Sequence, residues 1–381
     1  MINRIIAEEM RKTKKSVLLL GPRQVGKSTL IQSLKPDLEI NLADELEFLK
    51  YSSQPGAFRE TIEENSYKTI YIDEIQRLPK LLNTIQSIVD KNKNLKFYLT
   101  GSSARKLRRG EANLLPGRVL NFNLGPFVAS EFLYKMDTQK ALSFGTMPEP
   151  YLNKSEKENK QLLRSYAGNY LKEEIKAESL VRNLDSFARF FLDVSSLVAE
   201  FVDFTKLAQR AKISRHAIPR YFEILEDTLI GYRLNCFHSD DHDLDLIKHP
   251  KFYLFDNGVY NGLLENFIAS SDRIGKLSEQ LVFSQLLHSA WAKDQSIKLS
   301  SFRTRAGVEV DFIAEYDQEL FGIEVKTNDQ VMSRDLEGLR FFDKEVQRKK
   351  KLFVFHMGKE EKKSGTVWIL PWQKGLQEMG L

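Results

Sequence analysis

The sequence predicts an α/β protein of two or three domains, and three observations lead to this prediction. The chain has 381 residues, more than the roughly 250–300 that a single hydrophobic core usually supports. Up to about residue 135, short apolar segments rich in β-branched and aromatic residues alternate with helical patterns, as in a parallel sheet. A second series of short apolar segments follows residue 271 and indicates a second α/β unit.

The N-terminal elements follow from apolar segments of strand length. Residues 15–20, 69–72 and 96–100 are expected to be buried strands, because each is short, apolar and separated from the next by a helical pattern. Around residues 136–158 the composition becomes polar and includes glycine and proline, which we interpret as a linker.

The rest of the chain is expected to form a helical module and a second sheet. Residues 160–234 show the apolar spacing of helices. A helix after residue 271 precedes strands at Phe302 and at residues 310–314, 322–326 and 352–355. We therefore expect three domains over residues 1–140, 155–264 and 265–381, each of ordinary domain size.

Composition excludes several classes of protein. Hydrophobic residues make up 42% and charged residues 29%, which excludes a disordered chain and a collagen. Cys236 is the single cysteine, so no internal disulfide or cysteine metal site is possible, and we expect a reduced thiol. Apolar runs fall far short of the ~20 residues of a membrane span. We expect a cytoplasmic protein without a membrane partner, and its net charge of +5 is compatible with nucleic acid.

A phosphate-binding loop follows the first strand. Residues 21–28 fit the pattern G-x-x-x-x-G-K-[ST], with an expected strand before them and an expected helix after them. Their backbone N–H groups can surround phosphate oxygens, Lys27 can bridge the β- and γ-phosphates, and Ser28 can bind Mg²⁺. The alternative is a plain glycine turn. The expected nucleotide-contacting residues here are Gly21, Pro22, Arg23, Gln24, Val25, Gly26, Lys27, Ser28 and Thr29.

Polar residues that suit the same site follow later strands. Asp73 ends a buried strand, where it can hold Mg²⁺, and Glu74 can polarise the attacking water. Ser102 or Ser103, after the third strand, is placed to sense the γ-phosphate, although a simple turn is the alternative. Arg118 can neutralise γ-phosphate charge in its own subunit or in a neighbouring subunit of a homo-oligomer, or can be an ordinary solvated arginine.

These motifs resemble a widespread prokaryotic family that joins an AAA-type ATPase domain to a C-terminal domain of unknown function. The residues that carry the resemblance are the phosphate loop and residues 73–79, 99–103 and 115–119. The resemblance covers nearly the whole chain. It implies a P-loop NTPase fold and ATP binding with Mg²⁺, with Lys27, Ser28, Asp73 and Glu74 in the roles above.

A basic helix–turn–helix is expected in residues 204–234. Five basic residues against one acid give residues 201–221 a local charge of +4, which suits a DNA backbone. Residues 231–234 and 251–255 can pair as a wing, similar to the winged helix that the family is thought to contain. Pro219 requires the second helix to start late, with Arg215 and His216 in the turn. The alternative is a helical spacer with solvated charges.

Residues 238–249 contain three histidines and several aspartates. Their spacing matches no compact metal site, so we interpret the segment as an acidic loop.

Acidic residues and a lysine recur on the expected elements of the C-terminal unit. Asp311 lies in one expected strand, and Glu324 and Lys326 share one face of the next, where two carboxylates can hold Mg²⁺ beside a scissile phosphate. Glu279, on the preceding helix, is a further candidate metal ligand, and Glu309 competes with Asp311 for its position. This order of Glu, Asp and Glu-x-Lys resembles the restriction-endonuclease-like superfamily. Arg303 and Arg305 can face substrate phosphates.

The leading hypothesis is an ATP-hydrolysing AAA-type protein that couples ATP hydrolysis to DNA binding. A second hypothesis adds DNA cleavage at the C-terminal unit with Mg²⁺ or Mn²⁺. The expected catalytic residues are Lys27, Glu74 and Arg118 in the ATPase and Asp311, Glu324 and Lys326 in the nuclease-like unit. One alternative is an ATP-gated DNA-binding switch whose nuclease-like domain is inactive. Another is an ATPase that binds other proteins and never contacts nucleic acid.

Overall fold

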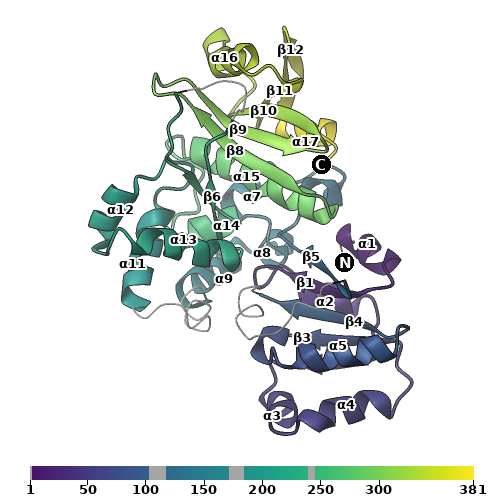
Figure 1. Cartoon of the computed structure of the whole chain (residues 1–381). Helices are drawn as coiled ribbons and strands as arrows, with labels where there is room; N and C mark the ends of the chain where they lie inside the picture. Colours follow the sequence, from purple (N-terminus) through teal and green to yellow (C-terminus); the bar gives the residue numbers. More distant parts are fainter. Residues whose placement is uncertain (1, 103–116, 171–183, 239–244) are drawn as a thin grey trace. The chain divides into compact units, whose positions relative to one another are not determined.

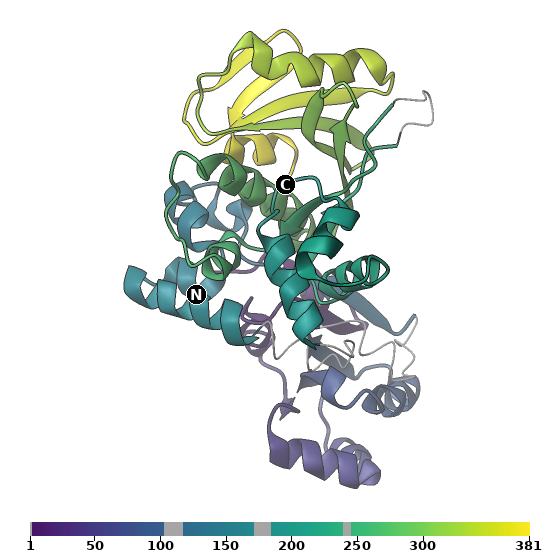
Figure 2. The ribbon, with the colours of Figure 1, turned by 90° about the vertical axis from the view of Figure 1, so that its left-hand side faces the viewer.

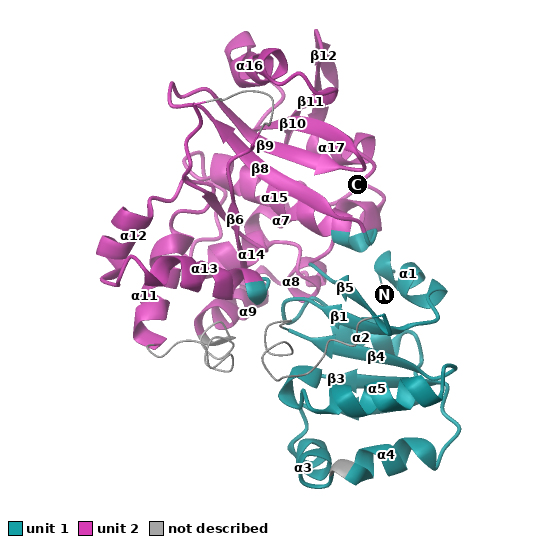
Figure 3. Ribbon diagram, in the orientation of Figure 1, with its two compact units in different colours: residues 1–125, 227–229, 291–294 teal, residues 126–226, 230–290, 295–381 magenta. Residues whose placement is uncertain are grey.

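The computed structural model of the chain describes residues 2–102, 117–170, 184–238 and 245–381 (Figure 1). The chain forms two compact units (Figure 3). Unit 1 contains residues 1–125, 227–229 and 291–294, and unit 2 contains the remainder. The helical module and the second sheet therefore lie together in unit 2, and our division of the chain into three domains stays a prediction.

Unit 1 is built on a five-stranded parallel sheet with the strand order β2-β3-β4-β1-β5. The strands are β1 (Ser16–Leu20), β2 (Leu38–Asn41), β3 (Thr69–Asp73), β4 (Lys96–Gly101) and β5 (Val119–Asn123). The parallel N-terminal sheet and three of its strands are thus confirmed. The helices are α1 (Ile6–Lys12), α2 (Lys27–Gln32), α3 (Glu45–Ser53), α4 (Pro55–Glu63), the 3₁₀ helix η1 (Ile75–Arg77) and α5 (Leu81–Lys91).

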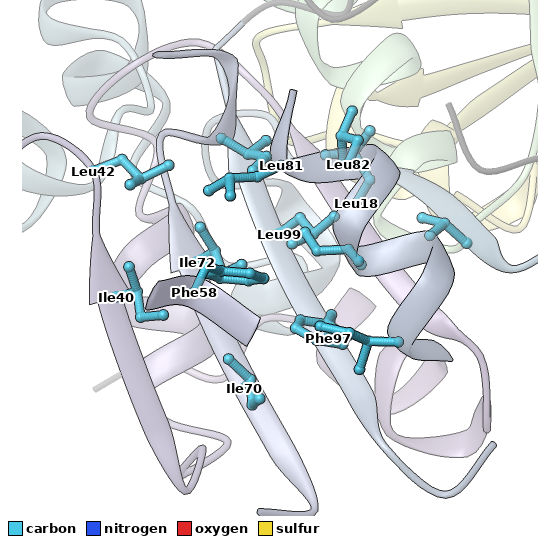
Figure 4. Packing of buried hydrophobic residues seen from close by; sticks show 14 of the residues in the cluster. Leu18, Ile40, Leu42, Phe58, Ile70, Ile72, Leu81, Leu82, Phe97 and Leu99 are labelled. Atoms are coloured by element: carbon cyan, nitrogen blue, oxygen red, sulfur yellow. The ribbon is translucent and has the colours of Figure 1, made fainter. Parts of the chain in front are cut away.

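The core of unit 1 explains why these segments form strands. β1 is buried along its whole length, as a central strand with both faces covered should be. Side chains from β1, β3 and β4 pack against helices α4 and α5 in one hydrophobic cluster (Figure 4). The amphipathic face of α5 supplies Leu81, Leu82, Ile85 and Ile88 to this cluster.

The first part of unit 2 is helical. Its elements are η2 (Ala129–Phe132), α7 (Thr138–Phe144), α8 (Pro148–Leu152), α9 (Glu156–Ser165), the π-helix η3 (Tyr166–Tyr170), α11 (Leu184–Ser195), α12 (Phe204–Ala211), α13 (Ala217–Asp227), α14 (Asn257–Leu263) and α15 (Ile274–Ala292). The interpretation of residues 136–158 as a linker was wrong. Asp137 caps α7, Pro148 begins α8, and most apolar side chains of this segment are buried, with Leu152 as an exposed exception.

The helix–turn–helix and the strand pair that follows it are confirmed. Helices α12 and α13 are joined by a short turn, and Pro219 is the third residue of α13, where its missing N–H leaves no helical hydrogen bond unmade. Arg215 and His216 precede this helix. Strands β6 (Gly231–Leu234) and β7 (Lys251–Leu254) pair antiparallel, with Leu234 opposite Lys251.

A six-stranded mixed sheet of order β12-β13-β11-β10-β9-β8 completes unit 2. Its strands are β8 (Ile297–Arg303), β9 (Glu309–Tyr316), β10 (Glu319–Lys326), β11 (Lys350–His356), β12 (Lys362–Ser364) and β13 (Val367–Pro371). The remaining helices are η4 (Ser333–Leu336), α16 (Glu337–Glu345) and α17 (Trp372–Glu378). The strands expected at Phe302 and at residues 310–314, 322–326 and 352–355 are all present.

Helices cover both faces of this sheet. Helix α16 lies on one face, and α15 and α17 lie on the other (Figure 2). Alternate residues of β11 point to opposite sides: Leu352 and Val354 belong to the cluster under α16, whereas Phe355 meets Gly375 of α17. No helix in the part of the chain that the structure describes has the length and hydropathy to cross a membrane.

Candidate functional site

The phosphate loop joins β1 to α2 at the carboxyl edge of the parallel sheet. Gly26 has a φ of +91°, a left-handed conformation that favours glycine. A Cβ on Gly21 would lie 2.2 Å from the carbonyl oxygen of Leu124, so the loop can pass there only with glycine. Lys27 is 6% exposed, and its ammonium donates to the carbonyl oxygens of Gly21 (2.8 Å) and Pro22 (2.9 Å).

A buried arginine that sequence reasoning missed supports the loop. The Arg4 guanidinium donates to the carbonyl oxygens of Val25 (2.8 Å) and Gly125 (2.7 Å). It therefore links the N-terminal segment, the loop and the end of β5 within unit 1. No motif in the sequence marks Arg4, because its partners lie 21 and 121 positions away.

The two candidate Mg²⁺ ligands of unit 1 lie together. The Ser28 hydroxyl donates to Asp73 Oδ2 at 2.9 Å. Ser28 follows β1 and Asp73 ends β3, and β4 lies between these two strands in the sheet. The Thr100 hydroxyl, at the end of β4, donates to Asp73 Oδ1, as does the backbone N–H of Glu74 (3.1 Å). A hydroxyl and a carboxylate are oxygen donors of the kind that Mg²⁺ prefers, so these residues fit the ion.

Glu74 is held by a side chain outside the predicted motifs. Its φ of +56° places a non-glycine residue in the left-handed region directly after β3. The buried Gln76 amide donates to Glu74 Oε2 and also lies 3.1 Å from Ser102 Oγ, which it can reach as a donor. Ser102 is thus connected to Glu74 through Gln76, and Ser103 lies outside the described residues.

Arg118 does not reach this edge of the sheet within one chain. It directly precedes Val119, which pairs with Ser16 at the amino end of β1. The loop follows Leu20 at the other end, roughly 13 Å along the strand. The guanidinium of Arg118 pairs instead with Asp90 (2.5 Å). The expectation that Arg118 contacts the nucleotide of its own chain is therefore wrong. A role of Arg118 in a neighbouring subunit stays a prediction.

In unit 2 the structure brings Glu279, Asp311, Glu324 and Lys326 together. Glu279 lies on α15, Asp311 on β9, and Glu324 and Lys326 on β10. The antiparallel register of β9 and β10 ends with Ile323 opposite Phe312, so the two strand carboxylates follow as neighbours. Lys326 donates to Glu324 Oε1 (2.9 Å), and the Val325 N–H donates to Asp311 Oδ2 (2.9 Å).

The centre of this cluster is the ammonium of Lys251, which the sequence did not indicate. Its side chain is 3% exposed and lies 2.8 Å from Glu279, 2.6 Å from Glu309 and 3.4 Å from Asp311. Glu309 and Asp311 therefore both face the cluster. Within the described residues, no group of three or more His, Cys, Asp or Glu is arranged to hold a metal ion.

Burial and like charge raise the pKa values of two carboxyl groups here. Burial, with the nearby Asp311 carboxylate, raises the pKa of Glu279 to about 7 although Lys251 opposes the change. The same two causes raise the pKa of Glu324 to about 8. Burial alone would lower the pKa of Lys251, but the three facing carboxylates outweigh it and raise that pKa.

The two arginines expected to face substrate are engaged with other side chains. Arg303 lies 3.4 Å from Glu309 and over the ring of Phe201. Arg305 pairs with Asp245 (3.0 Å) at the surface. Of the acidic loop expected at residues 238–249, residues 239–244 lie outside the described part of the chain.

The comparisons with known proteins agree with the first site. Residues 13–133 match a family described as an AAA domain. Residues 136–269 and 274–374 match two families described as domains of unknown function (DUF8612 and DUF4143). Together with the parallel sheet and the phosphate loop, the first match defines the N-terminal segment as an AAA-type P-loop domain.

Two curated relatives match most of the chain. An uncharacterized protein (MJ1544) of Methanocaldococcus jannaschii is 26% identical over 269 residues, which cover 65% of this chain and 58% of that protein. An uncharacterized protein of Haemophilus influenzae is 24% identical over 343 residues, which cover 81% of each chain. This chain thus spans less than two thirds of the first relative.

Similarity to solved structures is low. The replication initiator DnaA bound to AMPPCP and single-stranded DNA has a TM-score of 0.30 and 10% identity, covering 58% of this chain and 86% of that chain. The Hsp104–ADP complex of S. cerevisiae has a TM-score of 0.30 and 12% identity, covering 77% of this chain and 44% of that chain. The assignment of the N-terminal domain therefore depends on the family match and on its own strand order.

Proposed function

We propose that the protein binds ATP with Mg²⁺ and hydrolyses it at the phosphate loop of unit 1. The observation that carries the proposal is the 2.9 Å hydrogen bond between Ser28 and Asp73, which joins the loop to the tip of β3. A hydroxyl and a carboxylate at this distance can share one Mg²⁺ ion, as in P-loop NTPases. The match of residues 13–133 to an AAA domain supports the same function.

Each residue of the site has a role in this proposal. Lys27 exchanges the carbonyl oxygens of Gly21 and Pro22 for the β- and γ-phosphates, which are better partners for an ammonium. Glu74 orients and polarises the attacking water, while Gln76 keeps its carboxylate in place. Mg²⁺, when bound, neutralises the phosphate charge that develops during transfer.

Two substitutions separate binding from hydrolysis. Lys27→Ala should weaken ATP binding, and Glu74→Gln should leave ATP bound but reduce its turnover, since only the water-activating carboxylate is removed. Binding of a fluorescent ATP analogue and phosphate release measure the two effects. The matched controls are Lys12→Ala and Glu63→Gln, which change exposed residues of α1 and α4. Unchanged turnover in both site variants would refute the mechanism.

DNA binding by the helix–turn–helix is a second proposed function. Lys206, Arg210, Lys212, Arg215 and Arg220 are all exposed on α12, the turn and α13, with Asp193 as a partner of Arg210. Such a surface suits a phosphate backbone and does not by itself read bases.

A charge-reversal variant tests this second function. Lys212→Glu, Arg215→Glu and Arg220→Glu together should weaken binding to duplex DNA. They should also reduce the slope of log K against log salt by up to about 0.9 for each DNA phosphate that the protein no longer neutralises. Fluorescence anisotropy of labelled duplex between low and physiological salt measures both quantities. Charge reversal at the three exposed residues Lys344, Lys359 and Lys362 is the matched control. No retention of DNA by the wild type at low salt would favour the protein-binding ATPase instead.

A further inference from the structure

Lys251 enters the carboxylate cluster of unit 2 from a different part of the chain. It is the first residue of β7, the strand that pairs with β6 after the helix–turn–helix. Its ammonium contacts one carboxylate from α15 and two from β9, at 2.6–3.4 Å. A lysine side chain is seldom this buried, and here three carboxylate partners offset the loss of water.

The remaining polar partners of the cluster are also hydrogen-bond donors. Tyr253, on the same face of β7, donates to Glu279. The backbone N–H of Val325 donates to Asp311. Lys326 donates to Glu324 Oε1, whereas Glu324 Oε2 is buried without a hydrogen-bond partner among the described residues. Apart from Glu324 Oε2, the carboxylates that a nuclease would use as metal ligands therefore face a lysine ammonium and three other donors.

The positions of the Glu279 and Asp311 carboxylates around the Lys251 ammonium do not fit a divalent ion. Mg²⁺ requires oxygen ligands at about 2.0–2.1 Å on several sides. An ion equidistant from Glu279 and Asp311 would occupy the space that the Lys251 ammonium fills, and two cations would then be in contact in a buried site. Because the Lys251 side chain is only 3% exposed, its charge depends on these carboxylates rather than on water, and the ammonium cannot easily leave them.

We propose that the Lys251 ammonium is the fixed counter-ion of this cluster and takes the place of the divalent metal ion that a nuclease site needs. The cluster then binds no Mg²⁺ or Mn²⁺, and the six-stranded sheet is a scaffold that does not cleave DNA. In this arrangement Lys251 fastens β7 to α15 and β9. This inference is independent of ATP hydrolysis in unit 1.

Mn²⁺ binding by the wild type is the first test. Free Mn²⁺ is measured by electron paramagnetic resonance in nucleotide-free full-length protein, for the wild type and for Asp311→Asn. Both proteins carry the same phosphate loop, so any difference arises in unit 2. We expect identical binding and no cleavage of duplex or single-stranded DNA with either metal. An Mn²⁺ ion held by the wild type but absent from Asp311→Asn would overturn the proposal.

Removal of the ammonium is the second test. Lys251→Met keeps an unbranched apolar chain but leaves the carboxylates without their cation. We expect it to bind one additional Mn²⁺ at least tenfold more tightly than the wild type, and Lys251→Met with Asp311→Asn to release that ion. Lys350→Met removes another buried lysine of unit 2, paired with Asp343, and should bind no additional Mn²⁺.

The two tests together decide the proposal. A folded Lys251→Met protein, judged by circular dichroism and gel filtration, that binds no additional Mn²⁺ would contradict it. If Lys251→Met does not fold, the comparison of the wild type with Asp311→Asn still decides, because neither protein lacks the lysine.

Discussion

Gln76 is a residue whose importance lies in its contacts rather than in a motif. It is buried beside the tip of β4, and its amide donates to the Glu74 carboxylate and contacts Ser102. Gly101 leaves room for it, because a Cβ at that position would lie 2.8 Å from Gln76 Oε1. Gln76 is therefore a positioning residue for Glu74 in the proposed hydrolysis.

Replacement of Gln76 should affect turnover more than binding. In Gln76→Leu the Glu74 carboxylate loses its donor, and a misplaced general base costs up to about 10² in rate. We expect kcat for ATP to fall by about that factor while KM changes little. Steady-state phosphate release measures both constants, with Gln32→Leu on the exposed side of α2 as the control. An equal effect on KM would mean that Gln76 shapes the binding site instead.

His356 predicts a pH dependence of stability for unit 2. The ring is buried at the end of β11, where Nδ1 accepts from the Gly358 N–H (3.1 Å) and Nε2 donates to the Glu360 carbonyl (2.9 Å). Burial lowers its pKa, and Lys362 adds to this effect, although the Glu360 carbonyl and the Asp329 carboxylate oppose it. The folded protein therefore holds a neutral ring at pH values where the unfolded chain binds a proton.

The free energy of unfolding of unit 2 should therefore decrease as the pH is lowered. The contribution of His356 is complete above its ordinary pKa of about 6.5 and decreases as the pH falls below that value. We expect a lower urea midpoint at pH 5.5 than at pH 7.5, and a smaller difference in His356→Gln, which has no titratable ring. The tryptophans of unit 2, Trp368 and Trp372, report the transition by fluorescence. The same pH difference in the variant would assign the effect to other groups.

The residues that sequence reasoning found and those it missed differ in how far apart their partners lie. Lys27, Ser28 and Asp73 belong to local patterns of strand, loop and helix, so their grouping could be predicted. Arg4 and Lys251 act through partners that are distant along the chain, and nothing in their own neighbourhood distinguishes them from solvated residues. Only the folded chain shows which carboxylates surround a particular lysine.

At the level of elements, the strands of the N-terminal sheet were easier to predict than helices α7 and α8. Strands β1, β3 and β4 are short apolar runs with both faces buried, which leaves a clear pattern in the sequence. Residues 136–158 were misread because glycine and proline were taken to indicate a loop. Gly145 instead ends α7 with a φ of +73°, and Pro148 begins α8. Helix α7 is buried by packing against α14, which lies more than a hundred positions later, and Tyr151 of α8 packs against the rings of Phe127 and Phe132.

Asp256 connects the loop after α7 to α14 and should stabilise unit 2. Its Oδ1 accepts from the N–H groups of Gly258 (2.7 Å) and Val259 (3.1 Å), and its Oδ2 accepts from Thr146 N–H (2.7 Å). Its carboxylate is thus both the N-cap of α14 and the buried partner of the loop after α7. Burial raises its pKa to about 6, so it is ionised at pH 7.5.

Asp256→Ala should destabilise unit 2 by about 1–3 kcal/mol at pH 7.5. The loss of the cap and the buried Thr146 N–H left without an acceptor both contribute, while relief of the carboxylate's desolvation offsets part of the cost. Hydrogen exchange at the amides of Thr146, Gly258 and Val259 measures the effect. Asp137→Ala, which removes the exposed cap of α7, should cost no more than about 1 kcal/mol. An equal effect of the two variants would show that the Thr146 bond adds nothing.

At the scale of the whole molecule, the chain has two compact units with different chemistry. Unit 1 contains the parallel sheet and the phosphate loop, and its core cluster draws on β1, β3 and β4. Unit 2 has a separate cluster between its mixed sheet and α16. Because each unit has its own core, each should open in its own cooperative steps, and a ligand should protect the unit that binds it.

Hydrogen exchange with and without ATP and Mg²⁺ tests this separation. A ligand at 100 times its Kd stabilises the folded state that binds it by about 2.7 kcal/mol. We expect added protection at the amides of α2, β3 and β4, and little change in β9 and β10. Lys27→Ala should abolish the protection, whereas Lys251→Met should alter exchange in β7, β9 and α15 and leave the ATP effect on unit 1 intact. Equal protection of β9 and β10 by ATP would instead show that the two units open as one, because only a shared opening reaction transmits the binding energy of one site to every amide.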